Sequence, residues 1–336
     1  MRIALTYTLK SQAKVPSQSA LPDDWDEEFD SQETVDALAQ VIREMGHEPI
    51  PLGDGEDLIR ALLQKRPDFA FNFAEGEGVG RSREARVPAL LEMLRIPYSG
   101  SDPLTLATAL DKGITRRLVQ GGSVRVPKGF CLGPLDDANQ WHRLAAGLMF
   151  PVVVKPAWEG SSKGIRSKCL VEDEAGLAVV IDELRGAYLQ PLLIEEFIGG
   201  AEITVGLVGN DPAKVIGIME VVPLQPSERF LYSLEVKRDW ANRVRYQSPA
   251  KLDAACTAAL HTAALEAWTK LGCRDLCRID FRLNSKGEPV FIEANPLPGL
   301  NPTTSDLVLL AKGVGIGYAE LIRSVVEASL KRNGLA

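Results

Sequence analysis

Residues 277–295 hold two carboxylates and an amide at positions that a β-hairpin would bring together. Apolar and polar residues alternate along both halves of this stretch, so each arm would have one apolar face and one mostly polar face. Residues 284–287 (Asn-Ser-Lys-Gly) supply the Asn and Gly that tight turns between strands tolerate. The sequence therefore predicts a hairpin with one polar face.

The length of the turn predicts how the two arms pair. If the first and last residues of the turn face each other, Arg278 lies opposite Glu293 and Asp280 lies opposite Phe291. Asp280, Glu293 and Asn295 then share one face, with Arg278 beside them. A shift of one residue would put the carboxylates among aliphatic side chains, so the apolar pattern supports this pairing.

Asp280, Glu293 and Asn295 are candidate metal ligands, because carboxylate and amide oxygens are the hard donors that Mg²⁺ or Mn²⁺ prefers. The alternative is an ordinary half-exposed hairpin, because most charged side chains are simply solvated. The hairpin taken alone leaves both interpretations open.

A second candidate site follows the apolar run at residues 150–154. The run ends in Lys155 and leads into a stretch rich in Gly and Ser that includes Ser161, Ser162 and Gly164. Small residues let backbone N–H groups approach and cradle phosphate oxygens, and Lys155 could neutralise their charge. The alternative is a hairpin turn with a surface lysine.

A Gly-rich loop, residues 74–81 (Ala-Glu-Gly-Glu-Gly-Val-Gly-Arg), lies between a predicted strand at 68–73 and a predicted helix at 83–94. Loops at the carboxyl ends of strands are where α/β sheets bind ligands. The loop matches neither G-x-x-x-x-G-K-[ST] nor G-x-G-x-x-G, so it does not by itself identify a phosphate site.

The composition is that of a globular protein, with 336 residues, 45% of them hydrophobic and 25% charged. This length predicts two or three subdomains. The net charge of −7 gives no reason to expect nucleic acid or an anionic membrane as partner. No signal segment or membrane-spanning run is visible, so we expect a cytoplasmic location. Five cysteines without a Cys-x-x-Cys pair predict free thiols, and three scattered histidines do not favour histidine chemistry.

The first 73 residues alternate strand and helix patterns. Strands are predicted at 1–8, 48–52 and 68–73, and helices at 31–45 and 57–65. This order predicts a parallel sheet covered by helices.

Residues 10–30 interrupt that order with a long polar segment that contains an acidic run at 23–28. Long loops in compact domains are often functional, as lids or binding loops, or else mobile. A mobile surface excursion and a lid over a site are therefore both open.

The remainder of the chain predicts a mixed α and β arrangement without internal repeats. Residues 224–249 are expected to be irregular and rich in Arg and Lys. Strands are predicted at 127–132, 150–155, 192–198, 202–208 and 214–222, and helices at 104–110, 136–146, 173–184, 252–271, 305–312 and 318–331.

Three motifs in this order resemble the ATP-grasp fold. They are Val-Val-Val-Lys-Pro at 152–156 with the Gly/Ser loop, Ile-Glu-Glu-Phe-Ile-Gly-Gly-Ala-Glu at 194–202, and Arg-Ile-Asp at 278–280 with Glu-Ala-Asn-Pro at 293–296.

Within that fold the chain is similar to the D-alanine–D-alanine ligase family. The closer match rests on Ile-Pro-Tyr-Ser-Gly-Ser at 96–101, Leu-Asp-Lys at 110–112 and Asn-Pro-Leu-Pro-Gly-Leu at 295–300. The resemblance covers nearly everything after about Phe71.

The resemblance implies an α/β protein in which a Rossmann-like N-terminal domain precedes a two-lobed α+β ATP-grasp fold. The boundaries expected are 1–101 for the N-terminal substrate domain, 102–190 for the central lobe and 191–336 for the C-terminal lobe with the metal site. It also implies a homodimer.

The activity implied is ATP-dependent joining of a carboxylate to an amine. ATP would phosphorylate the carboxylate of one amino acid, the amine of another would attack, and ADP and phosphate would be released. Two Mg²⁺ ions held by Asp280, Glu293 and Asn295 would neutralise the ATP phosphates. Arg278 and the Gly299 N–H group would stabilise the oxyanion.

The resemblance also assigns the nucleotide-binding residues. Residues expected at the phosphates are Lys112, Lys155, Lys237, Ser161 and Ser162, and those expected at the adenosine are Glu195, Glu196 and the Ile198 backbone at the adenine and Glu202 at the ribose.

The chain departs from the family where the amino acids bind. The family's Gly-Gly-x-Ser-x-Glu loop after the first strand is missing, and its His-Gly-x-x-Gly-Glu-Asp-Gly segment is replaced by residues 72–80. Thr-x-His-Ser after the Pro-Gly pair reads as residues 301–306 (Asn-Pro-Thr-Thr-Ser-Asp). Candidates for a substrate ammonium are Glu75, Glu77 and Glu84, and candidates for a substrate carboxylate are Thr304 and Ser305.

For these five candidates the alternative is simple solvation. The sequence therefore favours a carboxylate–amine ligase over the D-alanine substrate in particular. A ligase with a non-alanine substrate or acceptor, in specialised metabolism, is the alternative. A nucleotide-binding protein without catalysis is disfavoured, because Arg278, Asp280, Glu293 and Asn295 are all present.

Overall fold

The computed structural model describes residues 1–12, 22–137 and 140–336. The chain begins with a parallel three-stranded sheet in the order β2-β1-β3, formed by β1 (Arg2–Tyr7), β2 (Glu48–Pro51) and β3 (Phe69–Phe73). Helices α1 (Gln32–Glu44) and α2 (Gly55–Gln64) connect its strands. The parallel sheet predicted from the alternating pattern is confirmed.

Three short helices lead from this sheet to the rest of the molecule, namely α3 (Arg86–Met93), α4 (Pro103–Leu110) and α5 (Lys112–Val119). Helix α5 was not expected from the sequence. Its N-cap is Asp111, whose Oδ1 accepts a hydrogen bond from the Ile114 N–H group at 2.9 Å. The cap satisfies a free N–H group of the first turn and starts the new helix at Lys112.

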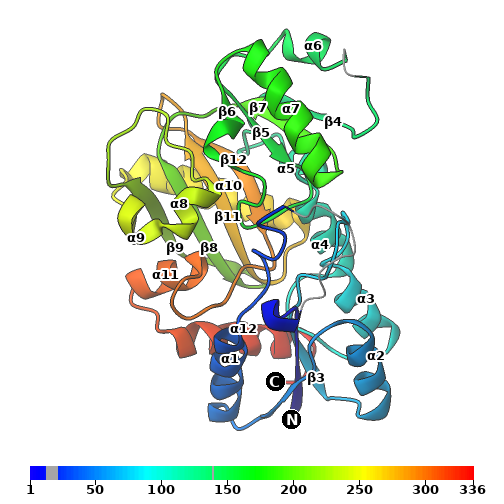
Figure 1. Ribbon diagram of the computed structural model, residues 1–336. Helices are drawn as coiled ribbons and strands as arrows, with labels where there is room; N and C mark the ends of the chain where they lie inside the picture. The colour runs from blue at the N-terminus through cyan, green and yellow to red at the C-terminus, as the bar shows by residue number, and fades with distance from the viewer. Residues whose placement is uncertain (13–21, 138–139) are drawn as a thin grey trace.

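The central lobe contains an antiparallel sheet in the order β4-β7-β5-β6. It is packed against α7, and in Figure 1 α6 and α7 lie on its outer side. The elements of this lobe are β4 (Gly129–Leu132), α6 (Gln140–Ala145), β5 (Val152–Pro156), β6 (Leu170–Val171), α7 (Glu174–Tyr188) and β7 (Leu192–Glu196).

The C-terminal lobe is built on a second antiparallel sheet, in the order β10-β9-β8-β11-β12. One face packs on α10, while α11 and α12 cover part of the other face. The elements of this lobe are β8 (Glu202–Gly209), β9 (Ala213–Pro223), α8 (Leu234–Arg238), α9 (Trp240–Arg243), β10 (Val244–Gln247), α10 (Ala254–Leu271), β11 (Asp275–Leu283), β12 (Pro289–Asn295), α11 (Asp306–Gly313) and α12 (Tyr318–Arg332).

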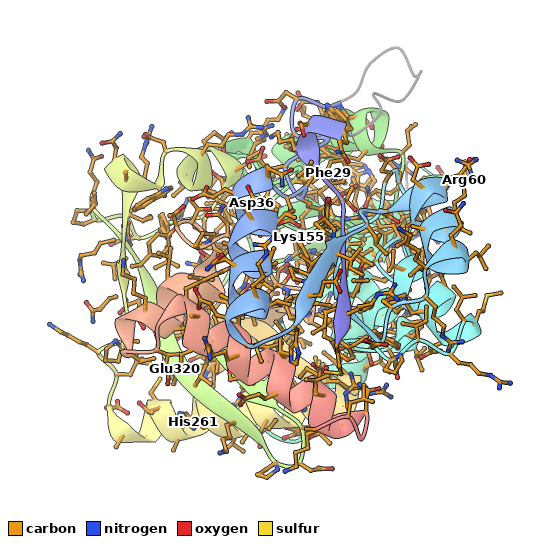
Figure 2. The ribbon with its side chains drawn as sticks, turned by 90° about the horizontal axis from the view of Figure 1, so that it is seen from below. Phe29, Asp36, Arg60, Lys155, His261 and Glu320 are labelled. Carbon is orange, nitrogen blue, oxygen red and sulfur yellow. The ribbon has the colours of Figure 1, made fainter. Side chains whose placement is uncertain are left out.

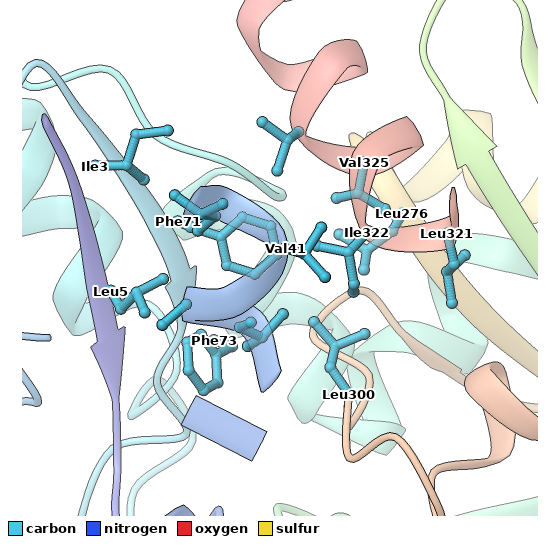
Figure 3. Close-up of a cluster of buried hydrophobic side chains, with 14 of the residues drawn as sticks. Ile3, Leu5, Val41, Phe71, Phe73, Leu276, Leu300, Leu321, Ile322 and Val325 are labelled. Atoms are coloured by element: carbon cyan, nitrogen blue, oxygen red, sulfur yellow. The ribbon is translucent and has the colours of Figure 1, made fainter. Parts of the chain in front are cut away.

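The last helix, α12, ties the two ends of the chain together. It lies beside α1 at the base of the molecule (Figure 1). Figure 3 shows Phe71 of β3 and Val41 of α1 close to Ile322 and Val325 of α12, in a cluster that also includes Leu276 of β11. The hydrophobic core therefore runs without interruption from the N-terminal sheet into the C-terminal lobe.

The expectation that residues 224–249 are irregular was wrong. This stretch forms α8, α9 and β10, and β10 pairs with β9 at the edge of the C-terminal sheet. Its sequence is too polar to indicate a strand, because an edge strand buries little and takes its hydrogen bonds from a distant partner. Among the described residues, no helix is both long enough and apolar enough to cross a membrane.

The predicted pairing of the hairpin was also wrong by one or two positions. Asp280 lies opposite Glu293, and Arg278 lies opposite Asn295. Two features cause the difference: the turn is closed by Asn284 and Glu288, and a bulge follows Asp280 in the pairing. A bulge adds one residue to one strand and cannot be read from the alternation of polar and apolar residues.

Candidate active site

Two adjoining pockets lie where the three parts of the molecule meet. The interlobe pocket separates the central sheet from the C-terminal sheet, and the inner pocket lies beside it against the N-terminal domain. Both are lined by the same five residues at their junction, which are Lys112, Glu159, Ser161, Arg278 and Glu293.

The central sheet gives the interlobe pocket a buried ion pair. Lys155 at the end of β5 and Glu195 on the neighbouring β7 lie 2.7 Å apart and are 3% and 5% exposed. In the view of Figure 2, Lys155 lies inside the molecule, whereas Arg60 lies at its edge. The alternative of a surface lysine is therefore wrong, and Lys155 is held in the pocket wall.

The segment after β7 continues this wall. Glu196 and Ile198 line the pocket together with the ring of Phe197. The Glu196 carboxylate is already engaged, because its Oε1 accepts a hydrogen bond from the Met149 N–H group at 2.8 Å. The backbone is engaged as well, because the Phe197 N–H group donates to the Pro151 carbonyl at 3.0 Å and the Ile198 carbonyl accepts from Arg282.

Arg282 of β11 fixes the far end of the interlobe pocket, and the sequence analysis missed it. Its Nη1 lies 2.6 Å from Glu202 Oε2, its Nε donates to the Ile198 carbonyl at 2.5 Å, and its guanidinium lies over the Phe197 ring. Burial raises the pKa of Glu202 to about 7, although the charge of Arg282 opposes this rise. Arg282 follows Arg278 and Asp280 in the alternating pattern of β11, and that signal could have identified it.

The Gly/Ser loop lines both pockets. Ser161 and Ser162 have φ values of 49° and 59°, a left-handed conformation that non-glycine residues rarely adopt. The Ser162 hydroxyl donates to the Tyr232 carbonyl at 3.3 Å, which joins the loop to the C-terminal lobe. Such conformations are frequent at ligand-binding sites, where the surrounding structure holds them.

The hairpin brings the predicted metal ligands together. The Asn295 amide nitrogen lies 3.3 Å from both Asp280 Oδ2 and Glu293 Oε1. Arg278 donates to Asp280 at 2.9 Å, and Lys112 lies 3.3 Å from Glu293. Burial would raise the pKa of Glu293, but the charges of Lys112 and Arg278 outweigh it and lower this pKa to about 2.

The residues fit a hard divalent cation by the chemistry of their donors, which are two carboxylates and an amide. In the part of the chain that the structure describes, no group of three or more His, Cys, Asp and Glu side chains is placed to hold a metal. The set at the hairpin has two such residues, and Asn295 is the third donor. To present its oxygen to a metal, the Asn295 side-chain amide would have to flip. The flip exchanges the positions of its oxygen and nitrogen atoms.

Arg278 and Gly299, the two predicted oxyanion donors, both line the inner pocket. Arg278 faces both pockets, and its Nη1 also donates to Asp306 Oδ2 at 3.2 Å, a partner that the sequence analysis missed. Gly299 lines the inner pocket, where a β-carbon would lie 2.9 Å from the Ser305 hydroxyl oxygen. A larger residue at this position would therefore displace the Ser305 hydroxyl. Lys237 of α8 lines the interlobe pocket.

The predicted amino-acid-binding residues divide into two groups. Glu75 and Glu84 line the inner pocket. Glu77 is exposed and lines neither of the two pockets. Thr304 and Ser305 also lie outside both pockets, because each hydrogen-bonds to the neighbouring Asn301 and shapes the loop instead.

A buried network of charges behind the inner pocket was not expected. Arg83 is 2% exposed and donates to both carboxylate oxygens of Glu28, at 2.8 and 2.7 Å. Lys163 lies 2.6 Å from Glu159 and 3.1 Å from Glu28. Glu28 belongs to the acidic run. Its two cationic partners could not be identified from the sequence, because both lie far away in the chain.

The acidic segment, residues 22–30, packs against the Gly/Ser loop. Asp24 is fully buried and accepts hydrogen bonds from the Gly164 N–H group and the Tyr188 hydroxyl, both at 2.9 Å. Glu28 accepts a hydrogen bond from the Gly160 N–H group. In Figure 1 this blue segment reaches from α1 to the central lobe. For these residues the mobile interpretation is wrong, and residues 13–21 lie outside the described part of the chain.

Comparisons with known proteins agree with this architecture. A family model described as D-ala D-ala ligase C-terminus matches residues 134–327. The D-alanine–D-alanine ligase of Halalkalibacterium halodurans is 33% identical over 298 residues, which cover 88% of this chain and 92% of that protein. An uncharacterized protein of Sinorhizobium fredii, y4sG, is 32% identical over 305 residues, covering 88% of this chain and 87% of its own.

The fold is shared with solved structures. The crystal structure of the D-alanine–D-alanine ligase of Bacillus anthracis aligns with a TM-score of 0.74 at 25% identity, and its complex with ATP aligns with 0.73 at 23%. Each alignment covers 99% of both chains. The fold and the site thus define an ATP-dependent ligase of the ATP-grasp class that forms C–N bonds. More narrowly, the chain belongs to the D-alanine–D-alanine ligase family.

Proposed function

We propose that this enzyme joins the carboxylate of one amino acid to the amine of a second, with conversion of ATP to ADP and phosphate. One observation carries the proposal. Lys112, Arg278 and Glu293 line both pockets, so a phosphate group in the interlobe pocket and a carboxylate in the inner pocket would meet at these side chains. The junction therefore brings together the two groups that must react.

ATP is assigned to the interlobe pocket. Lys112, Lys155 and Lys237 supply positive charge for its phosphates, and the N–H groups of the Ser161–Ser162 turn lie over them. The adenine takes the place beside Glu195 and the backbone at Ile198, with Glu196 fixing that backbone from behind. Glu202, oriented by Arg282, is placed to accept from the ribose hydroxyls.

The reaction divides into two steps. A carboxylate oxygen of the first amino acid attacks the γ-phosphorus and ADP leaves. The amine of the second amino acid then attacks the acyl carbon, and phosphate leaves with that carboxylate oxygen as the amide forms. The oxyanion of the tetrahedral intermediate is stabilised by Arg278 and the Gly299 N–H group, and loss of one such donor costs about a hundredfold or more in rate.

Magnesium belongs to this proposal. Asp280, Glu293 and Asn295 would hold two Mg²⁺ ions, or Mn²⁺ in their place. Bound there, the ions supply charge neutralisation for the ATP phosphates.

The substrates are amino acids whose ammonium groups face Glu75 and Glu84. D-Alanine is the substrate named for the relatives, and a non-alanine substrate or acceptor is the second candidate. The observation that favours the second candidate is the inner pocket itself, in which Glu28, from the acidic segment, stands beside Glu75 and Glu84. A homodimer in the cytoplasm completes the proposal. The net charge of −7 gives no reason to add nucleic acid or an anionic membrane as a partner.

The test is a product screen by mass spectrometry. Purified protein is incubated with ATP, Mg²⁺ and pooled D- and L-amino acids, and ADP release is followed in parallel. A new amide formed together with ADP is the expected result. ADP release without any amide would mean that the reaction stops at the acyl phosphate. No nucleotide turnover with any pool would contradict the proposed function.

A further inference from the structure

Three carboxylates at and behind the inner pocket have no positively charged partner. They are Asp30, Glu75 and Glu84. Among the residues that the structure describes, none of the three side chains accepts a hydrogen bond or forms an ion pair. Glu84 is 7% exposed and faces into the pocket together with Glu75. A buried carboxylate without a partner is costly, so such groups usually mark a place where a ligand binds.

The cations nearby are already engaged. Arg83 binds both oxygens of Glu28, and Lys163 lies 2.6 Å from Glu159. Lys112 lies 3.3 Å from Glu293 on the other side of the pocket. These basic residues therefore form ion pairs with other carboxylates. None of them forms an ion pair with Glu75 or Glu84.

The pKa values of the three carboxylates agree with this lack of neutralising partners. Burial raises the pKa of Glu84 to about 7, although Arg83 opposes the rise, and the charge of Glu28 adds to it. Burial and the charge of Glu84 raise the pKa of Glu75 well above its ordinary value. Burial raises the pKa of Asp30 to about 7. Each of these groups would be stabilised in its charged form by an added cation.

A bound metal ion is not expected to be the cation that stabilises these carboxylates. No three acidic, histidine or cysteine side chains in the described ranges are close enough to coordinate one. Two carboxylates without a third ligand for a metal ion can still bind an organic molecule that carries two separated positive charges.

We propose that the inner pocket binds an amino acid with a second cationic group, a diamino monocarboxylic acid, and that Glu75 and Glu84 bind its two ammonium groups. The inference rests on the proposed function and narrows its substrate. The substrate carboxylate points to Lys112 and Arg278 at the junction with the interlobe pocket, where it is activated. An amino acid with a neutral side chain has only one ammonium group, so it neutralises only one of the two carboxylates.

The first experiment compares amino acids in the ATP-dependent assay. Alanine is set against 2,3-diaminopropionate, 2,4-diaminobutyrate, ornithine and lysine, each in the D- and L-form, with ADP release and amide mass as readouts. At least one diamino acid is expected to give a kcat/KM about tenfold or more above that of alanine. A clear preference for alanine, with amide formed, would overturn this inference and leave the ligase proposal standing.

The second experiment uses variants. Glu84→Gln and Glu75→Gln should each lower kcat/KM for the diamino acid by about tenfold or more. The loss for alanine should be smaller in the variant that lacks the carboxylate facing the side-chain ammonium. Glu77→Gln is the matched control, because Glu77 lies in the same loop but is exposed and outside the pocket. Its kinetics should be unchanged.

Comparing the loss of kcat/KM for diamino acids with that for alanine separates selection of the substrate side chain from a general role in the reaction. An equal loss for diamino acids and for alanine in both variants would make Glu75 and Glu84 general participants in the reaction, and would overturn their role in selecting the side chain. Absence of turnover with every amino acid would instead contradict the proposed function itself.

Discussion

At the scale of single residues, the site is a set of charges held in place by other charges. Arg278 connects Asp280 to Asp306, Lys112 faces Glu293, and Arg282 fixes Glu202. Replacing one member by a neutral side chain of the same shape should therefore change the chemistry more than the fold.

The metal assignment predicts that Asp280→Asn and Glu293→Gln each lower ATP turnover by about a hundredfold or more, because a neutral amide binds a divalent cation far more weakly than a carboxylate does. The measurement is ADP release at saturating ATP and Mg²⁺, with circular dichroism to show that the fold is kept. Lys286→Ala in the exposed hairpin turn is the control and should keep full activity. Full activity of either carboxylate variant would refute the assignment.

The raised pKa of Glu84 predicts that the stability of the folded protein depends on pH. Its pKa is raised to about 7 in the folded protein, so folding retains its proton and stability falls as pH rises from about 4.5 to about 7. Glu84→Gln removes this loss. The variant should be more stable than the wild type at pH 8, by up to about 3 kcal/mol, and equal to it at pH 4.

Denaturant titrations of both proteins at the two pH values measure this difference. A variant that is less stable than the wild type at pH 8 would show that Glu84 is compensated in the folded state. That outcome would also remove the support that this residue gives to a dicationic substrate.

At the scale of elements, the acidic segment holds the Gly/Ser loop from outside. Asp24 accepts from the N–H group of Gly164 and Glu28 from that of Gly160, so both ends of the loop are fixed. Between them, the Lys163 N–H group donates to the Gly160 carbonyl at 2.9 Å, and the N–H groups of Ser161 and Ser162 have no partner among the described residues. The segment adds further contacts to the C-terminal lobe, where Arg238 lies 2.8 Å from Glu27.

Weakening the contact between Asp24 and the Gly/Ser loop should weaken nucleotide binding. Asp24→Asn loses a charged acceptor that receives hydrogen bonds from the loop and from Tyr188, and such bonds contribute about 1.5–3 kcal/mol. The KM for ATP is expected to rise about tenfold or more, with a smaller change in kcat. Hydrogen exchange should become faster at residues 160–164.

The control for the acidic segment is Asp26→Asn, because Asp26 contacts Lys10 at 3.4 Å and does not contact the loop. It should leave the KM for ATP within about twofold of the wild type. An unchanged KM in the Asp24 variant, with unchanged exchange in the loop, would contradict a positioning role for the segment.

At the scale of the whole molecule, the two ends of the chain share one core. Helix α12 is packed on α1 and on the N-terminal sheet, while its neighbour α11 is packed on β8 and β9. The N-terminal and C-terminal parts should therefore unfold together.

Ile322→Ala is expected to lower the free energy of unfolding by about 2–5 kcal/mol, because Ile322 is fully buried at the centre of this shared core. Calorimetry should show one transition that includes the N-terminal sheet, in the variant and in the wild type. Leu63→Ala is the control, because Leu63 is 69% exposed and should change stability by less than about 0.5 kcal/mol. A separate early transition of the N-terminal domain would contradict a shared core.

Much of the site could be predicted because its residues lie in short motifs on regular strands. Asp280, Glu293 and Asn295 alternate along a hairpin, and Lys155 ends a run of valines, so period and composition placed them. The pairing of the hairpin was missed because a bulge shifts it. Strand β10 was missed because its hydrogen bonds come from β9, and the acidic segment because its partners Arg83, Lys163 and Tyr188 are far away in sequence.

The sequence by itself thus determined the class of fold, the family and the candidate groups for binding ATP and metal, since these depend on local patterns. Only the tertiary structure decided which carboxylates are neutralised and which are not. Glu28 and Glu84 look alike in the sequence, yet Glu28 meets Arg83 and Lys163 while Glu84 meets neither a hydrogen-bond donor nor an ion-pair partner among the described residues. Charge compensation in a buried site depends on distances between segments remote in the chain, and the electrostatic energy falls with those distances rather than with separation in sequence.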